Sequence, residues 1–292
     1  MVARPDTVLG ILDAASAWLE SRGVDAPRRS VELLMGHVLR LDRLHLYLAH
    51  DRPLSESERS ELRALVARRA QHEPVAHLLG TWDFYGHELE VNRDVLVPRP
   101  ETEGLVELVL KELGDSPARV IDLGTGSGAI AIAIALERPL VELVAVDRSA
   151  AALAVAARNV ARHGLGSRVT LRQGSWWSAL AAGDAPFDLM VANPPYCDPQ
   201  RANDVDDDVR RYEPGDALWS PPGRPAACYE EIAAAAPRHL RAGARLCFET
   251  GLGAAEPARD ALLAQPSLCD VQLLDDLEGR PRYLVARVRA GT

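Results

Sequence analysis

The tetrapeptide Asn193-Pro194-Pro195-Tyr196 combines residue types that could hold a planar nitrogen for reaction. An amide or aromatic amino nitrogen attacks carbon poorly because its lone pair is delocalised. The side-chain oxygen of Asn193 could accept one N–H group and the backbone carbonyl of Pro194 the other, while the prolines stiffen the loop. Tyr196 could stack on the planar group or face a cation. We therefore interpret Asn193, Pro194 and Tyr196 as catalytic, although Asn-Pro also occurs in rigid turns that bind nothing.

A glycine-rich turn lies upstream, between a predicted buried strand and a predicted helix. Glycine lets the backbone approach a ligand and adopt positive φ, and a helix N-terminus offers free N–H groups. The pattern is Asp-x-Gly-x-Gly-x-Gly, which differs from the G-x-G-x-x-G of dinucleotide enzymes. The leading Asp122 would repel a phosphate but would suit the ammonium group of S-adenosylmethionine. A tight turn without a ligand is the alternative. The predicted cofactor contacts of this turn are Asp122, Gly124, Thr125, Gly126, Ser127 and Gly128.

Two further segments suit the same cofactor. Asp147 ends the next predicted strand, where a carboxylate can accept both ribose hydroxyls. Alone, Asp147 could instead cap the helix that follows. Ser175 and Trp176 follow the third predicted strand and are candidates for the adenine edge and face, although Trp176 and Trp177 could equally belong to the core. Together with Asn193, these residues favour methyl transfer to nitrogen.

Alternating strands and helices must position these residues. Strands are predicted at 119–123, 141–146, 168–173, 187–192 and 243–249, and helices at 101–113, 128–137, 149–163, 226–240 and 255–264. This alternation predicts a parallel sheet covered on both faces, with the site beyond the carboxyl ends of the strands. Two last strands, 270–275 and 282–288, would form an antiparallel hairpin. The predicted fold is α/β: a Rossmann-like methyltransferase fold with a mostly parallel seven-stranded sheet.

The beginning of the chain has a different pattern. Apolar residues at helical spacing predict a first helix that begins near Val8 and ends at Gly23 as its C-terminal cap. Further helices are predicted at about 27–40, 42–49 and 55–72, the last opened by a capping box of Ser55 and Glu58. Aromatic and alternating residues then predict a β-hairpin within 77–92. We expect three parts, namely an all-α domain at 1–75, a β-hairpin linker at 76–98 and a catalytic domain at 99–292.

The composition limits which kinds of binding partner and location we expect. The net charge is −9, and the residues after 75 carry all of it, so the chain lacks the basic bias of proteins that bind nucleic acid directly. No apolar run is long enough to span a membrane, and the N-terminus is typical of an amphipathic helix rather than a signal peptide. The four cysteines have no metal-ligand spacing. We therefore expect free thiols, no metal and a cytoplasmic location.

With these motifs in place, the sequence resembles the release factor glutamine methyltransferases, the HemK/PrmC group, over nearly its full length. The segment VLVPRPETE at 95–103 is the most specific, because adenine-N6 methyltransferases of DNA and RNA share the Asn-Pro-Pro-Tyr motif. The segments that carry the resemblance are 73–80, 84–86, 95–103, 122–128, Asp147, 193–196, 208–214, 249–251 and 279–282.

The resemblance implies that S-adenosyl-L-methionine donates a methyl group to the side-chain N5 of the glutamine in the Gly-Gly-Gln motif of peptide chain release factors. It also implies that the helical domain helps to dock the release factor. By position, Asn193 would contact the cofactor as well, and 193–196 would hold the glutamine. Leu96 and the stretch Arg99–Glu103 would line the entrance. For Arg99 and Glu103, a local ion pair between them is an equal alternative.

Other interpretations stay open. The acidic run 204–208 is interpreted as a solvated, mobile loop, with a lid for a basic partner as the alternative. An adenine-N6 methyltransferase acting on DNA or RNA would need a basic track and base flipping, which the acidic balance disfavours. A cofactor-binding module without catalysis is opposed by the intact Asn193.

Overall fold

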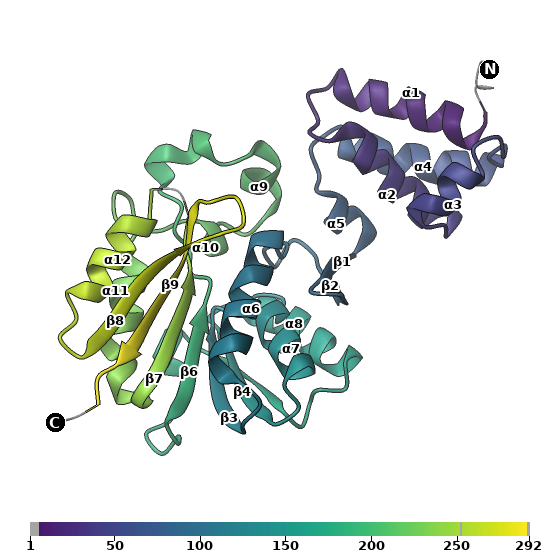
Figure 1. Ribbon diagram of the computed structural model, residues 1–292. Helices are drawn as coiled ribbons and strands as arrows, with labels where there is room; N and C mark the ends of the chain where they lie inside the picture. Colours follow the sequence, from purple (N-terminus) through teal and green to yellow (C-terminus); the bar gives the residue numbers. More distant parts are fainter. Residues whose placement is uncertain (1–5, 252, 291–292) are drawn as a thin grey trace. The chain divides into compact units, whose positions relative to one another are not determined.

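A computed structural model describes residues 6–251 and 253–290 of the chain, which divides into two compact units. One unit comprises Met1–Thr81 together with Asp207–Tyr212, and the other comprises Trp82–Asp206 and Glu213–Thr292. The first unit is mainly helical, and the second contains the large sheet (Figure 1).

The sheet has seven strands in the order β5-β4-β3-β6-β7-β9-β8. β9 is antiparallel to both β7 and β8, and the other neighbouring pairs are parallel. The predicted mostly parallel seven-stranded sheet with an antiparallel C-terminal hairpin is therefore confirmed. The strands are β3 (Ala118–Leu123), β4 (Val141–Asp147), β5 (Val169–Gln173), β6 (Phe187–Ala192), β7 (Leu240–Glu249), β8 (Leu268–Asp275) and β9 (Pro281–Val288).

Helices cover both faces of the sheet (Figure 1). One face carries α6 (Pro100–Leu113), α7 (Ala129–Glu137) and α8 (Ala150–Arg162), and the other carries α11 (Ala227–Ala235) and α12 (Ala255–Leu263). Successive strand residues point to opposite faces, so Val120 and Leu143 belong to one apolar core while Ile121 and Val144 belong to the other. Because both faces are buried, the parallel strands are almost continuously apolar.

The register of the parallel strands aligns their carboxyl ends. Leu123 at the end of β3 pairs with Val146 of β4 and with Ala192 of β6, and Ala192 pairs with Phe248 of β7. The residues that follow these positions therefore meet at one edge. The chain reverses its strand order between β3 and β6, which is where open α/β sheets bind ligands.

The helical unit packs around one apolar core that includes Leu12, Leu34 and Leu62. Ser55 and Glu58 form the predicted capping box at the start of α4. The buried Arg69 donates a hydrogen bond to Asp208 (3.1 Å) within this unit. Its helices are α1 (Val8–Glu20), α2 (Pro27–Leu39), α3 (Arg43–Leu48), α4 (Glu56–Arg69), α5 (Val75–Leu79) and α9 (Asp207–Tyr212).

The β-hairpin predicted within 77–92 is confirmed, because β1 (Thr81–Phe84) and β2 (His87–Glu90) pair as strands. The first residues of that segment belong instead to the end of α5. Tyr85 and Gly86 join the two strands with positive φ values, as the tightest hairpin turns require. The prediction of a loop for the acidic run 204–208 was wrong, because Asp204 is the last residue of the 3₁₀ helix η2 (Pro199–Asp204) and Asp207 is the first residue of α9. Asp204 and Asp207 are exposed, as expected.

The described cysteines are free thiols, with Cys247 fully buried. Among the described helices, none combines the length and the apolar composition that crossing a membrane requires.

Candidate active site

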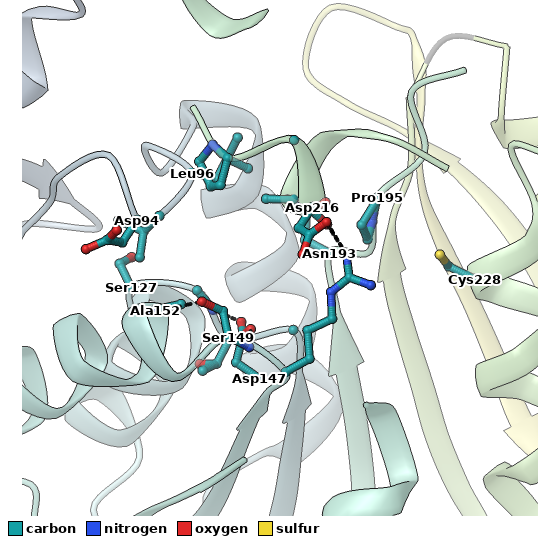
Figure 2. Close-up of a pocket in the computed structure, with 18 of the residues that line it drawn as sticks. Asp94, Leu96, Ser127, Asp147, Ser149, Ala152, Asn193, Pro195, Asp216 and Cys228 are labelled. Carbon is teal, nitrogen blue, oxygen red and sulfur yellow. Dashed lines mark hydrogen bonds and ion pairs between the residues drawn. The ribbon is translucent and has the colours of Figure 1, made fainter. Parts of the chain in front are cut away.

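A cavity of about 810 Å³ lies at the carboxyl edge of the sheet, within the usual size range of small-molecule sites. Its wall comes from the turns after β3, β4, β5 and β6, together with residues 93–98 and 214–221. Asp147, Asn193 and Asp216 surround the same open space (Figure 2). The structure thus brings four separate sequence motifs to one cavity. The predicted residues in its wall are Leu96, Thr102 of the Arg99–Glu103 stretch, Gly124, Thr125, Gly126, Ser127, Asp147, Ser175, Trp176, Asn193 and Pro195.

Other predicted residues lie outside this wall: Arg99, Glu103, Asp122, Gly128, Pro194 and Tyr196. Pro194 is buried, and the ring of Tyr196 lies on Gly251, where an added Cβ would come within 2.3 Å of Cε2 of Tyr196. Gly128 is the N-cap of α7, with φ of 84°. These residues support the cavity from behind, and their predicted direct contacts stay predictions.

The glycine turn is held by backbone hydrogen bonds. The N–H groups of Gly124 and Thr125 both donate to the carbonyl of Val146 (2.9 Å each). Gly124 and Gly126 have φ values of 82° and 56°, which side-chain-bearing residues rarely adopt. The turn therefore curls over the end of β4 and presents its backbone to the cavity.

Asp122 lies beneath this turn and is fully buried. Its Oδ2 accepts a hydrogen bond from the Thr125 hydroxyl (2.6 Å), whereas Oδ1 has no partner among the described residues. Burial raises the pKa of Asp122 to about 7, against the Thr125 hydrogen bond, which lowers it. A buried carboxylate oxygen without a partner is suited to a cationic group of a ligand.

Asp147 enters the cavity at the end of β4. Its Oδ2 accepts the N–H of Gly126 and its Oδ1 the N–H of Ser149 (2.9 Å each). The N-cap of α8 is Ser149, whose hydroxyl accepts the N–H of Ala152 (3.1 Å), so the alternative role of Asp147 as that cap is wrong. Each carboxylate oxygen accepts more than one hydrogen bond, which leaves Asp147 capacity for ligand hydroxyls.

The two tryptophans after β5 have different environments. Trp176 lines the cavity, with its ring over Gly124 and its indole N–H donated to Glu231 (3.2 Å). Trp177 is buried in the core, donates to the carbonyl of Ile232 (2.9 Å) and stacks on His239. Trp177 thus belongs to the core, whereas Trp176 lies at the cavity and its contact with adenine stays a prediction. Both rings come from the 3₁₀ helix η1 (Trp176–Ala179).

Asn193 follows β6 and reaches the cavity. Its Nδ2 donates a long hydrogen bond (3.4 Å) to the hydroxyl of Thr102, a buried residue of α6. Burial raises the pKa of Glu249, which ends β7, while interactions with Thr102 and with the Asn193 amide lower it, so the three side chains lie close together. Thr102 thus contacts Asn193 within the cavity wall, and Glu249 lies outside that wall.

Arg99 and Glu103 do not pair with each other. Arg99 Nη2 donates to Glu213 Oε1 (2.5 Å), and the other oxygen of Glu213 accepts the N–H of Val97 (3.1 Å). Glu103 instead accepts the N–H of Tyr85 (2.8 Å). The buried Glu213 therefore ties the segment that begins the 214–221 wall to the VLVPRPETE segment.

Thr102 belongs to the predicted Arg99–Glu103 stretch and lines the cavity beside Asn193. No role was predicted for three other residues at this site, namely Glu249, Arg148 and Asp216. Glu249 lies behind Asn193, and its only sequence signal was its place in a segment that carries the family resemblance. Arg148 and Asp216 form an ion pair (2.8 Å) beside the cavity, drawn as a dashed line in Figure 2. That pair joins the turn after β4 to α10 (Gly215–Leu218). No local sequence pattern predicts it, because the two residues are far apart in the chain.

The fold and this site define a methyltransferase-fold protein. The crystal structure of a methyltransferase from Pyrococcus furiosus superimposes with a TM-score of 0.51 at 15% identity, covering 80% of this chain and 100% of that chain. The family model described as methyltransferase small domain matches residues 102–209.

Sequence relatives identify the family. A release factor glutamine methyltransferase of Chlorobaculum tepidum is 42% identical over 95% of this chain and 96% of its own length. One from Geobacter sulfurreducens is 38% identical over 99% and 100%, and one from Bordetella pertussis is 45% identical over 88% and 93%. The PrmC N-terminal domain model matches residues 11–80. The chain therefore belongs to the release factor glutamine methyltransferase family, which confirms the resemblance.

Proposed function

We propose that this chain is a protein-(glutamine-N5) methyltransferase that transfers a methyl group from S-adenosylmethionine to the glutamine of the Gly-Gly-Gln motif in peptide chain release factors. The observation that carries the proposal is the position of Asn193, which lines the same cavity as the glycine turn and Asp147. The names of the relatives supply the substrate.

The cofactor side of the cavity has groups that match S-adenosylmethionine. Asp122 offers a buried carboxylate oxygen to an ammonium group, Asp147 offers acceptors to ribose hydroxyls, and Trp176 offers a flat apolar ring to adenine. Bound there, the cofactor supplies a methyl group activated by its attachment to sulfur. Ser175, also in the wall, lies at the predicted adenine edge.

On the nitrogen side, the oxygen of Asn193 and the carbonyl of Pro194 would each accept one N–H of the glutamine amide. Two acceptors favour the pyramidal nitrogen that must form as its lone pair is engaged. Holding the nitrogen in line with the methyl carbon contributes roughly 7–11 kcal/mol in favourable cases. Tyr196 and Pro195 would complete the substrate contact, with Leu96 and the Arg99–Glu103 stretch at the entrance.

The remaining parts of the proposal concern the partner. Residues 1–75 would dock the release factor, 76–98 would link the two domains, and 99–292 would catalyse the transfer. Because the proposed substrate is a protein, we propose no direct contact with nucleic acid. The net charge of −9 agrees with this. The cytoplasm, where translation ends, is the proposed location.

The test incubates the full chain with methyl-labelled S-adenosylmethionine and purified release factor, followed by mass analysis of the Gly-Gly-Gln peptide. We expect label on that glutamine, a strong loss with Asn193→Ala, and no change with Gln272→Ala, an exposed residue of β8. An unlabelled glutamine peptide in the presence of bound cofactor would refute the proposal. Methylated adenine after incubation with DNA or RNA would replace it with the adenine-N6 function.

A further inference from the structure

Three side chains from distant segments meet at the wall of the cavity. Thr102 comes from the first turn of α6, Asn193 follows β6, and Glu249 ends β7. The pairing of Ala192 with Phe248 places Asn193 and Glu249 beside each other. Thr102 and Glu249 are 5% and 2% exposed. Asn193 and Thr102 line the cavity, and Glu249 lies outside its wall.

We propose that Glu249 and Thr102 are positioning residues that hold the Asn193 amide with its oxygen toward the substrate nitrogen, and that the negative charge of Glu249 stabilises the positive charge that develops there. This inference rests on the proposed function, because it assigns roles within the same methyl transfer. Glu249 lies outside the cavity wall, whereas Thr102 lies in that wall next to Asn193. In the proposed arrangement both act through Asn193.

The direction of the hydrogen bonds follows from the chemistry of each group. An ionised carboxylate only accepts, so in the interaction that lowers the Glu249 pKa the Thr102 hydroxyl would be the donor. Its oxygen is then an acceptor for Nδ2 of Asn193 (3.4 Å). The nitrogen end of the Asn193 amide is thereby committed to Thr102 and Glu249, and its oxygen end points away from them. A chain of polarised hydrogen bonds also makes that oxygen a stronger acceptor.

The charge of Glu249 has a use in the transfer. As the amide nitrogen forms its bond to the methyl carbon, the carbon–sulfur bond breaks with its electron pair left on sulfur, and the nitrogen becomes positive until its proton passes to water. The negative charge of the buried Glu249, which lies next to Asn193, favours this positively charged state, because electrostatic interactions are stronger away from water.

The surroundings of Glu249 let its carboxyl group change protonation state near neutral pH. Burial raises the pKa of Glu249 to about 7, while the Thr102 hydrogen bond and the charge of Arg282 lower it. The other ionisable groups that face it are Glu101 on α6, Tyr196 after β6, Tyr229 on α11 and Tyr283 on β9. Oε2 of Glu249 has no hydrogen-bond partner among the described residues, so few contacts oppose proton exchange.

The experiment compares Glu249→Gln, Thr102→Val and Thr102→Ser with the control Glu256→Gln, an exposed acid of α12. Turnover with release factor, cofactor Kd and thermal unfolding are measured from pH 6 to 8.5. We expect Glu249→Gln to lower kcat roughly 10- to 100-fold, as for other partners that orient a site residue, with cofactor Kd within threefold. At saturating cofactor, so that protonation of Asp122 does not limit the rate, the wild-type rate should fall as pH drops below about 7, where Glu249 gains a proton. The variant should lose this dependence.

Thr102→Val keeps the side-chain shape but removes the hydroxyl, and we expect a similar loss of kcat. Thr102→Ser restores the hydroxyl and should recover at least tenfold over Thr102→Val, which keeps the test valid if Glu249→Gln folds poorly. A Glu249→Gln rate that falls only in proportion to the folded, cofactor-bound fraction overturns the proposal, as does an unchanged pH profile. A wild-type protein that leaves release factor unmethylated overturns the proposed function itself and this inference with it.

Discussion

The two sides of the cavity are built in different ways. On the cofactor side, one short turn supplies most of the groups, and backbone N–H groups hold Asp147 in place. On the nitrogen side, Asn193 is held by Thr102, 91 residues away in sequence, and by Glu249 from a third segment. A site made from contiguous backbone can be recognised in the sequence, whereas a site made from separate side chains depends on the fold that assembles them.

The two buried carboxylates sharpen this contrast. Asp122 and Glu249 both have a pKa raised to about 7 by burial. The hydroxyl bonded to Asp122 belongs to the same turn, Thr125, while the hydroxyl bonded to Glu249 comes from α6. We therefore expect changes on the cofactor side to alter affinity or stability, and changes on the nitrogen side to alter turnover.

The largest effect is expected for Asn193→Ala. Removing one preorganised polar contact should lower turnover roughly 10²-fold or more, while cofactor affinity stays within a few fold. Initial rates of methyl transfer to release factor and calorimetric titration with cofactor provide the two measurements. Unchanged turnover would refute the role assigned to Asn193 and remove the basis of the comparison.

Asp147→Ala should have the opposite effect, weakening cofactor binding while leaving turnover nearly unchanged. It removes acceptors for ribose hydroxyls and the partner of the Gly126 N–H, so cofactor Kd should rise roughly 10- to 100-fold, or about 1.4–2.7 kcal/mol. Turnover at saturating cofactor should change by no more than a few fold. If saturating cofactor fails to restore the rate, the two sides of the cavity are not separable in this way.

Asp122→Asn tests the buried carboxylate of the cofactor side through stability. Because the folded pKa of Asp122 is raised, its stabilising contribution is present below the unfolded value near 4 and is lost as pH rises through about 7. Without cofactor, the variant should gain on the order of 2 kcal/mol relative to wild type between pH 5 and pH 8. Denaturant unfolding at both pH values measures this gain. Glu249 is present in both proteins, so its own titration cancels, and a pH-independent difference would contradict the raised pKa.

The smallest effect is expected for Arg148→Ala or Asp216→Ala. Their side chains are 55% and 78% exposed, and exposed ion pairs contribute little because water and salt screen them. Cofactor Kd should change less than about fivefold in either variant. Titrations at low and high salt check this, and a much larger, salt-sensitive change would show that this pair belongs to the binding site proper.

Much of the molecule could be predicted from the sequence. The periodic apolar segments predicted the alternation of strands and helices along the chain, the antiparallel C-terminal hairpin and the capped helix α4. Each of these features depends on residues that are neighbours in sequence. The glycine turn and Asn193 were recognisable for the same reason, because their residue types are needed locally. Short helices such as α5 and α9 escaped prediction, since they have too few residues to show a period.

Only the tertiary structure decided which side chains share an environment. It separated Trp176 at the cavity from Trp177 in the core, and it paired Arg99 with Glu213 instead of Glu103. It also brought Thr102 and Glu249 together with Asn193. Local residue types determine the backbone that can form, but strand register and helix packing determine which distant side chains meet, and burial there sets their charge.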